Sequence, residues 1–563
     1  MPEPVAFFFA LAILYSLFLI EGLLVLLALS RKKFALGSSL ERRLEAPVRW
    51  LTLRPARAVI FIGCLAFFGR GVLLPFLPER QPMITDEFSY LLGADTFAAG
   101  RLANPPHPMW QHFETMHVLQ QPTYSSMYQP SQGLILAAAK VAGGHPWIGV
   151  WLTASLMCAC ICWMLQGWLP PRWALLGGLL VVMRLGLFSY WMNSYWGGAA
   201  AATGGALLLG ALVRLRRRPS VPHAFLMGLG AAILSLSRPA EGFVLCLAAG
   251  IMLLPRLRGN VIRVALPVAT VVLPAFAFMG LYFYRVTGSP FQVPQLVQRE
   301  LYAITPLFLW ESPKPEPVYR HKAMRDFYAG WEMADAWETR SALGLVRNAL
   351  RKVISAWVFY LGPALTVPLV MLPRVVKDRR LKPLVWIGIV CLFGLSLNAW
   401  FYAHYAAPIV ALLFALIVQA IRHLRALDRT TGRGRFLARA VPGICALMIG
   451  IRLTSGAAGF LPPPNWPMVW YHTSPGNTER ARVAGELSRR DGLHLAMVRY
   501  GPDHQPVMNE WVFNDAGIDA SKIVWAREMD PANNAGLLRY YSNRHAWLVE
   551  ADRVPARVTP YPR

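Results

Sequence analysis

The chain has 563 residues, of which 55% are hydrophobic and 15% are charged, and its formal net charge is +26. Soluble domains carry roughly a quarter charged residues, so this composition excludes an ordinary soluble enzyme and indicates an integral membrane protein. In a soluble protein the basic excess would suggest nucleic-acid binding, but in a membrane protein Lys and Arg gather in cytoplasmic loops. We therefore expect membrane lipids, and no nucleic acid, among its partners.

Twelve apolar segments are candidates for membrane-spanning helices, which need about 20 residues each. They lie near 5–29, 57–77, 147–169, 173–190, 196–213, 223–237, 240–255, 262–284, 350–373, 383–401, 404–422 and 440–460. The first has no basic residue before it and "RKK" after it, which predicts a transmembrane helix with its N-terminus outside and not a signal peptide. Residues 132–143 are apolar but too short to span, and we expect a half-helix at the membrane interface.

Basic clusters alternate along the chain with loops of balanced or acidic charge. The clusters fall at 31–57, 214–218, 256–263, 374–382 and 422–439. Twelve spans place every cluster on the cytoplasmic side and both termini outside, as the positive-inside rule requires. The expected location is therefore a bacterial cytoplasmic membrane, with residues 78–130 and 286–345 as the first and second outer loops. Three basic residues at the outer end of a span either reach lipid headgroups or meet an anionic substrate; they are Arg347, Arg351 and Lys352.

The predicted fold class is a polytopic α-helical membrane protein of about twelve transmembrane helices with a small C-terminal α/β domain. An extra N-terminal helix (1–30) precedes a transmembrane domain (57–460), and "PPPNWP" at 462–467 is the predicted linker. Residues 461–563 then combine a charged helical stretch with short apolar runs, a pattern typical of an α/β domain. About 100 residues are enough to bury a core.

Polar side chains near the outer ends of several spans mark a candidate binding site, because charge in a membrane is costly without a partner or water. They are Arg70, Arg184, Asn193, Tyr195, Arg238, Glu241, His404 and Tyr405. A shared depth on four or more helices predicts a pocket that opens outward and suits an anionic, sugar-like ligand, since arginine matches phosphate with its fork of donors. An ordinary ion pair between Arg238 and Glu241, and an interfacial belt of aromatic residues, are the structural alternatives.

An acidic pair, Asp86 and Glu87, opens the first outer loop in "ITDEFSYLL". Thr85 is expected as the N-cap of a helix, with the two carboxylates in its first turn, where they favour the helix dipole. Neighbouring residues on a helix diverge by about 100°, so at most one of the two faces a reacting group. Helix capping and catalysis both remain open from these residues alone.

Three histidines and a carboxylate in the same loop raise the question of a metal site: His107, His112, Glu114 and His117. Histidines five residues apart on a regular helix differ in direction by about 140°, so a helix would not gather them. We expect no cofactor, with a divalent cation as the less favoured alternative.

The first outer loop resembles the membrane-embedded GT-C glycosyltransferases, in the branch with protein O-mannosyltransferases and the aminoarabinose transferase of lipid A. The matching residues are Asp86, Glu87, Tyr90, Ala94, Gly100, Tyr124, Tyr128, Pro130 and Gly133. "SRPAEGF" (237–243) is similar to the family's Arg-Pro-Glu-Gly segment with one residue inserted, and "HYAAP" (404–408) to its later Arg/His-Tyr-x-x-Pro element. Met127 stands where the family usually has Lys, and "QPSQG" replaces "PPG", which leaves the identity of the donor open. The resemblance covers residues 57–425.

The resemblance implies an inverting glycosyltransferase that moves a sugar from a polyprenyl-phosphate donor to a glycan, lipid or protein acceptor at the outer face. It implies that Asp86 is the general base, that Glu87 orients Asp86 or the acceptor, and that Tyr90 and Tyr128 bind substrate. Arginines would stabilise the leaving phosphate. A transporter or flippase for a lipid-linked saccharide, with its charges near the bilayer midplane, and a non-catalytic membrane scaffold are the competing functions.

Overall fold

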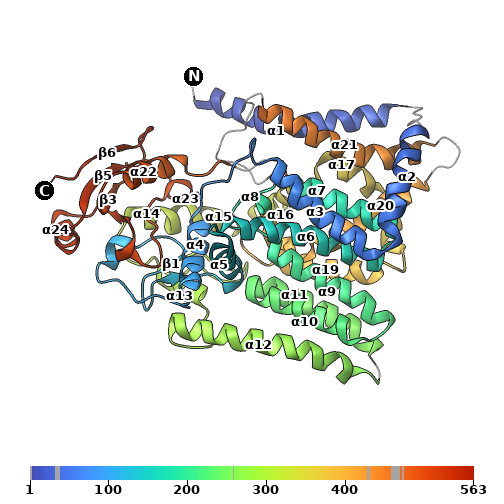
Figure 1. The fold of residues 1–563 in the computed structure, drawn as a ribbon, viewed down its shortest axis with the longest axis horizontal. Coiled ribbons are helices and arrows are strands. Elements are labelled where there is room, and N and C mark those ends of the chain that lie inside the picture. Colours follow the sequence, from blue (N-terminus) through green and yellow to red (C-terminus); the bar gives the residue numbers. More distant parts are fainter. Residues whose placement is uncertain are drawn as a thin grey trace.

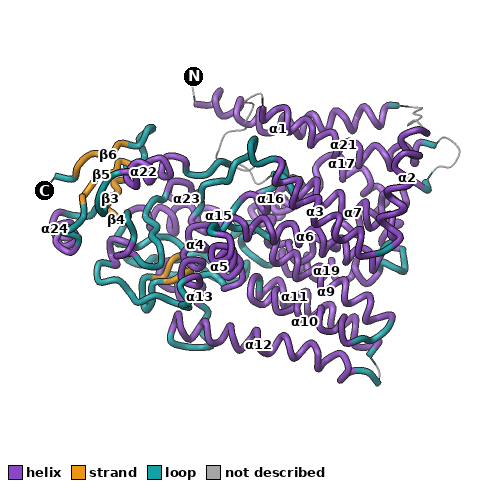
Figure 2. The backbone as a smooth tube through the Cα atoms, in the orientation of Figure 1, coloured by secondary structure: helices purple, strands orange, loops and turns teal. Residues whose placement is uncertain are grey.

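The computed structural model describes residues 3–31, 38–257, 259–427, 432–457, 469–471 and 474–562. A bundle of helices forms one part of the molecule, and the C-terminal sheet lies at its other end, with α4 and α5 between the two (Figure 1). Helices dominate, and the strands are confined to a short hairpin and to the C-terminal sheet (Figure 2). The predicted linker "PPPNWP" lies outside the described residues.

The helices of the bundle are as follows. They are α1 (Glu3–Ser30), α2 (Ser38–Leu53), α3 (Pro55–Val72), α6 (Trp147–Trp168), α7 (Pro171–Leu185), α8 (Tyr190–Asn193), α9 (Ala199–Arg217), α10 (Val221–Ser237), α11 (Pro239–Leu253), α12 (Val261–Thr287), α16 (Ala342–Ala356), α17 (Gly362–Thr366), α18 (Leu372–Lys377), α19 (Lys382–Ser396), α20 (Val410–Arg425) and α21 (Arg433–Ala457). Each of the twelve predicted spans falls on one or more of these helices.

Eight helical stretches of the described chain are long and apolar enough to cross a membrane by themselves. They are Pro55–Val72, Trp147–Trp168, Ala199–Arg217, Pro239–Arg256, Val261–Thr287, Ala342–Lys377, Ala403–Arg425 and Arg433–Ser455. Shorter apolar helices occupy Ser16–Ser30, Val221–Ser237 and Lys382–Ser396. Much of the apolar surface of α12 is exposed, including Ile262, Leu266 and Leu273, which suits contact with lipid. The chain is a multi-pass membrane protein, and the predicted fold class is confirmed.

Small residues bring α9 close to its neighbours at the centre of the bundle. Its sequence contains Gly204, Gly205 and Gly210, and all of its residues from Ala199 to Val213 are buried. A Cβ atom on Gly205 would lie 1.8 Å from the carbonyl oxygen of Pro408. Glycine therefore lets α9 pack directly against the "HYAAP" segment, as small residues do in membrane bundles.

Residues 78–130 and 286–345, predicted as the first and second outer loops, fold into short elements beside the bundle. The first contains α4 (Thr85–Ala98), β1 (Val118–Leu119) and β2 (Ser125–Ser126), and is followed by α5 (Pro130–Gly143); the second contains α13 (Pro294–Tyr302), α14 (Lys322–Arg325) and α15 (Glu332–Glu338). The segment predicted as a half-helix, 132–143, is the body of α5. Strands β1 and β2 pair antiparallel and close the end of the first loop against α4.

The C-terminal α/β domain holds a four-stranded sheet of order β4-β3-β5-β6. Its elements are α22 (Thr478–Arg489), β3 (His494–Arg499), α23 (Pro506–Asn509), β4 (Ile523–Arg527), α24 (Pro531–Tyr540), β5 (His545–Glu550) and β6 (Arg557–Pro560). Strand β3 runs parallel to both β4 and β5, with Met497 opposite Ala526 and Leu548, whereas β5 and β6 are antiparallel.

One face of this sheet packs on the helix that carries the acidic pair. Alternate residues of β3 point to opposite faces, so Leu495 and Met497 join Phe88 of α4 in one core, while Val498 packs with Val483 of α22 in another. Because both faces are covered, β3 is apolar throughout its centre, as parallel strands usually are. The C-terminal domain therefore fixes α4 from the side away from the bundle.

Candidate functional site

Helix α4 begins one residue earlier than the sequence suggests. Ile84 is the N-cap, so Thr85, Asp86 and Glu87 occupy the first three helical positions. The prediction of Thr85 as N-cap is therefore wrong by one residue. The physical reason is that Glu87, at the third position, accepts a hydrogen bond from the backbone N–H of Ile84, while the Thr85 hydroxyl turns to His117, 2.9 Å away.

Glu87 is sealed inside the protein. Its side chain is 0% exposed and pairs with Arg80 at 3.2 Å. Oε2 also accepts from the backbone N–H of Met83, and Oε1 accepts from the backbone N–H of Tyr195 at 3.1 Å. Both oxygens are thus engaged, and the carboxylate links the start of α4 to the segment after α8.

Asp86 faces a different environment, and 22% of its side chain is exposed. Oδ1 accepts a 2.5 Å hydrogen bond from the Tyr128 hydroxyl, and Oδ2 lies 3.5 Å from Nδ1 of His117. The ring of Tyr128 stacks on Tyr90 with 4.5 Å between centroids. As expected from the 100° divergence, the two consecutive carboxylates point to different surroundings, and Asp86 is the one that solvent reaches.

His117 holds its place beside Asp86 in an unusual backbone conformation. Its φ of +61° makes it the single described non-glycine residue with a positive φ, a conformation that costs of order 1 kcal/mol or more. Its carbonyl accepts from the Ser89 hydroxyl at 2.7 Å and from the backbone N–H of Met127, and its own N–H donates to the Tyr328 hydroxyl. Three separate segments therefore fix the imidazole against Asp86.

The partners of Asp86 decide its protonation state. Burial alone would raise its pKa, but the charge of His117 and hydrogen bonds from His117 and Tyr128 outweigh burial and hold the pKa below its ordinary value. Burial and the Asp86 charge raise the pKa of Tyr128. Asp86 is therefore an ionised carboxylate with a protonated tyrosine beside it.

Arg238 is the cation of this region and lies against Tyr405. It stands between α10 and α11, 22% exposed, with its guanidinium carbon 4.5 Å from the Tyr405 ring centroid and Nη1 3.8 Å from Glu241. Burial raises the pKa of Tyr90, the Arg238 charge lowers it, and the Asp86 charge raises it. The contact between Arg238 and Tyr405 joins "SRPAEGF" to "HYAAP", and both charges act on the hydroxyl of Tyr90, four residues after Asp86 on α4.

His404 borders this place from within the bundle. Its Nδ1 lies 3.0 Å from the Tyr190 hydroxyl, and its ring packs against Trp196 at 4.7 Å and Tyr405 at 5.1 Å. Only 3% of His404 is exposed. It supports Tyr405 through an aromatic layer and does not reach solvent itself. We call Asp86, Tyr90, Tyr128, Arg238, Glu241 and Tyr405, with His117 and His404 behind them, the acidic-pair cluster.

Three other predicted residues form a separate group behind Glu87. Arg70 donates from Nε to Oδ1 of Asn193 at 2.7 Å and lies over Trp147, while Asn193 also donates to the carbonyls of Leu187 and Ser189. Tyr195 donates to Glu79 at 2.9 Å. Arg70 is 1% exposed. These residues fix the chain after α7 and are not in contact with Asp86.

Arg184 lies deeper still and has a partner that the sequence reading missed. It is 0% exposed, forms an ion pair with Glu21 of α1, and stacks over Trp470 at 4.3 Å. Glu21 also accepts from the backbone N–H of Ala364 at 3.1 Å. We therefore assign Arg184 to the core of the bundle and not to the binding site. The available signal was Glu21 itself, an acidic residue inside an apolar run, which needs a partner.

The four residues considered for a metal do not converge. Nε2 of His107 lies 3.0 Å from Asp519, Nδ1 of His112 lies 3.0 Å from the carbonyl of Arg527, and Glu114 accepts from Tyr302. His117 faces Asp86. Within the described ranges, no group of three or more His, Cys, Asp or Glu residues is arranged to hold a metal ion.

The chain is similar to known proteins at the level of solved structures. No family model and no curated protein matches the chain. The Archaeoglobus fulgidus oligosaccharyltransferase in complex with zinc and sulfate is similar with a TM-score of 0.48 and 11% identity, over 88% of this chain and 67% of that one. ArnT from Cupriavidus metallidurans bound to undecaprenyl phosphate is similar with a TM-score of 0.48 and 10% identity, over 89% and 93%. At such identities, the roles of individual residues rest on the geometry of this chain.

Proposed function

We propose that the chain is a glycosyltransferase that takes a sugar from a polyprenyl-phosphate donor and passes it to an acceptor at the outer face of a bacterial cytoplasmic membrane. The observation that carries the proposal is the arrangement of Asp86 and Arg238. Both are partly exposed, they have opposite charges, and Tyr90 lies within electrostatic reach of both. An anionic leaving group and a hydroxyl to be deprotonated need these two charges side by side.

In this reaction the acceptor oxygen attacks the anomeric carbon while the bond from that carbon to the phosphate oxygen breaks. Asp86 takes the acceptor proton, and the electron pair leaves with the polyprenyl phosphate. Arg238 holds the developing phosphate charge, because guanidinium matches phosphate oxygens in geometry. Attack from the face opposite to the leaving phosphate inverts the configuration at the anomeric carbon.

The remaining members of the cluster position these groups. Tyr128 and His117 each contact one oxygen of Asp86 and fix the carboxylate. The Arg238 guanidinium lies over the Tyr405 ring, and Glu241 is near enough to orient the guanidinium. Glu87 anchors the start of α4 through Arg80 and takes no proton in this scheme. No step requires a metal ion.

Sidedness follows from the charge pattern. With the basic clusters in the cytoplasm, the acidic-pair cluster, the C-terminal domain and both termini lie outside. The donor enters from the membrane, and the acceptor, a glycan, lipid or protein, enters from the aqueous side.

Membranes from a strain that lacks the gene, and from the same strain complemented with the wild-type chain, test the proposal. Mass spectrometry of outer-surface glycans and lipids identifies the product, and free polyprenyl phosphate is measured in parallel. A transferase yields a glycosylated acceptor together with released polyprenyl phosphate. Movement of an intact lipid-linked sugar without that release would instead assign a flippase, and no difference between the strains would favour a scaffold.

A further inference from the structure

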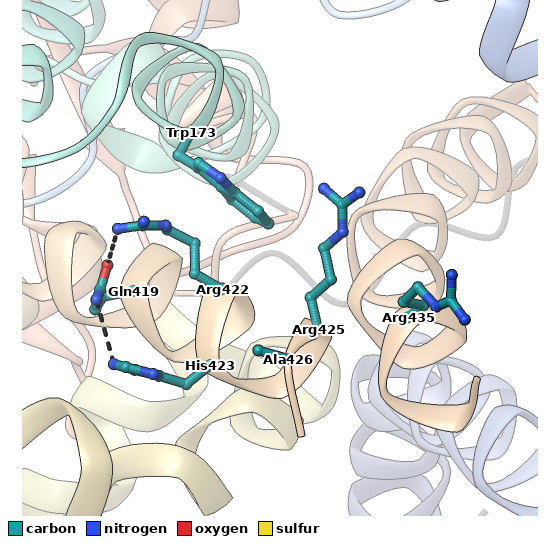
Figure 3. A pocket seen from close by; sticks show the side chains of 7 residues that line it. All are labelled: Trp173, Gln419, Arg422, His423, Arg425, Ala426 and Arg435. Carbon is teal, nitrogen blue, oxygen red and sulfur yellow. Dashed lines mark hydrogen bonds between the residues drawn. The ribbon is translucent and has the colours of Figure 1, made fainter. Parts of the chain in front are cut away.

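A cavity of about 560 Å³ opens at the end of the bundle where basic residues gather. It lies between the start of α7, the end of α20 and the start of α21 (Figure 3). Trp173 comes from α7, Arg422 and Arg425 come from the last turn of α20, and Arg435 comes from the first turn of α21. It contains none of the acidic-pair cluster.

The lining is strongly cationic. Three arginines contribute to it, together with His423 and Gln419, and no carboxylate is among the described residues that line it. Among those residues, Arg425 and Arg435 form no ion pair with a carboxylate, and both are exposed. A cavity with this composition favours an anion.

Buried contacts hold part of the lining in a fixed geometry. Gln419 is 4% exposed; its Oε1 accepts from Nη1 of Arg422 at 2.7 Å, and its Nε2 donates to Asp378 at 2.5 Å (Figure 3 shows the contact with Arg422). The Gln419 amide therefore orients Arg422, while the nearest carboxylate, Asp378, lies behind Gln419 and 3.7 Å from His423. The guanidinium carbons of Arg422 and Arg425 each lie 5.9 Å from the Trp173 ring centroid.

We propose that this cavity binds a phosphate group, presented by the headgroup of an anionic phospholipid. Guanidinium forks match phosphate oxygens, and basic pockets between transmembrane helices on the cytoplasmic side bind lipid headgroups. The cavity lies at the ends of two helical stretches that are long and apolar enough to cross a membrane, and in the basic cluster 422–439 that predicts the cytoplasmic side. Free phosphate has the same chemistry and is the other possible source.

The lipid would bridge three helices. A phosphate between Arg425 and Arg435 joins the end of α20 to the start of α21, and Arg422 and Trp173 close the side toward α7. Since "HYAAP" lies in the short helix Ala403–Ile409 directly before α20, occupancy of this cavity would stabilise the helix that follows this part of the acidic-pair cluster.

Native mass spectrometry of the full-length protein in detergent tests the proposal. The probes are phosphatidylglycerol, zwitterionic phosphatidylcholine and inorganic phosphate. Wild-type protein is expected to retain phosphatidylglycerol over phosphatidylcholine. The double variant R425Q/R435Q is expected to bind it about a hundredfold more weakly, since it removes two charge-assisted hydrogen bonds and each contributes about a factor of ten. The matched control R263Q removes an exposed arginine of another basic cluster and should leave binding unchanged.

The outcomes separate the sources. Saturable phosphate binding that competes with phosphatidylglycerol and is lost in R425Q/R435Q supports the site with either source, and phosphate binding without lipid retention assigns free phosphate. Equal retention of phosphatidylglycerol by wild type and R425Q/R435Q, or an equal loss in R263Q, would overturn the proposal. A thermal melt of each variant, followed by intrinsic fluorescence, shows whether a loss of lipid binding comes from unfolding. If the double variant does not fold, the single variants R425Q and R435Q are measured in its place.

Discussion

Asp86 and Glu87 are consecutive residues of one helix turn, yet 22% of the Asp86 side chain is exposed and none of Glu87 is. The α-helix turns neighbouring side chains apart by about 100°, and the surroundings complete the division. Glu87 is bonded to Arg80 and to backbone N–H groups, whereas the side-chain partners of Asp86 within the described chain are Tyr128 and His117, and part of its surface remains open to a ligand. Of the two consecutive carboxylates, Glu87 therefore anchors the start of α4 and Asp86 is left partly exposed.

Glu87→Ala is expected to destabilise the protein, because it leaves Arg80 buried without its partner. Breaking a buried ion pair by removing one side typically costs about 3–5 kcal/mol. Asp86→Asn, at a partly exposed position, should change stability far less. Thermal unfolding in detergent, followed by tryptophan fluorescence, compares the two variants; equal midpoints for both would contradict the division of labour between the carboxylates.

His117→Asn is expected to shift the acidic limb of the pH–rate profile to higher pH. The folded-state pKa of Asp86 is depressed, partly by the charge of His117, so the carboxylate stays ionised as pH falls until that lowered pKa is reached. Without the imidazole the pKa rises and the ionised fraction is lost at a higher pH. Asparagine tolerates the left-handed backbone that His117 adopts, which protects the fold. An unchanged acidic limb would show that His117 does not act on Asp86.

Asp95, on the next turns of α4, should make the fold less stable as pH rises. Burial raises its pKa to about 6, with the Lys140 hydrogen bond opposing the rise and Asp515 adding to it. The folded state then holds a proton that the unfolded state has lost above its pKa of 3.8. Stability therefore falls between about pH 4 and pH 6, by at most about 3 kcal/mol. In Asp95→Asn the midpoint of unfolding should depend less on pH across this range. The same pH dependence in the variant and the wild type would argue against a buried, protonated Asp95.

Gly205→Ala is expected to disturb the acidic-pair cluster from a distance. The new Cβ would lie 1.8 Å from the carbonyl oxygen of Pro408, so the "HYAAP" segment must move. Overpacking of this kind typically costs about 1–3 kcal/mol, and it should also reduce activity by shifting Tyr405 under Arg238. Gly250→Ala is the matched control, since nothing lies within 4 Å of its added Cβ. Equal activity in the two variants would mean that α9 does not position Tyr405.

Glu21→Gln should unfold the bundle more readily without a specific effect on substrate affinity. Arg184 would lose the carboxylate that compensates its buried charge, and glutamine, which is neutral and of similar size, cannot replace that charge. In a double-mutant cycle with Arg184→Gln, the two losses should not add. A rise in KM for either variant, with an unchanged midpoint of unfolding, would instead assign Arg184 to the binding site.

The sequence predicted what depends on local composition and order. Long apolar runs predicted helices because a lipid core leaves few other ways to satisfy the backbone, and the divergence of Asp86 and Glu87 follows from helix geometry alone. The start of α4 was placed one residue late because Glu87 caps Ile84 from inside the helix.

Contacts between distant segments could not be predicted in the same way. Arg184 meets Glu21 across 163 residues, and neither position indicates the other. Equally, β1 and β2 bring His117 against Asp86 only after the loop has folded, so a histidine that suggested a metal site is instead a neighbour of the carboxylate.

The most direct test of the account is sugar transfer by Asp86→Asn. Membranes with the wild-type chain, with Asp86→Asn and with the surface variant Arg263→Gln are compared for glycosylated acceptor and released polyprenyl phosphate. A positioned general base contributes about 10²–10⁴-fold, so Asp86→Asn should lose that factor while its unfolding midpoint stays near that of the wild type. Transfer by a folded Asp86→Asn protein at the wild-type rate would contradict the assignment of Asp86 as the base.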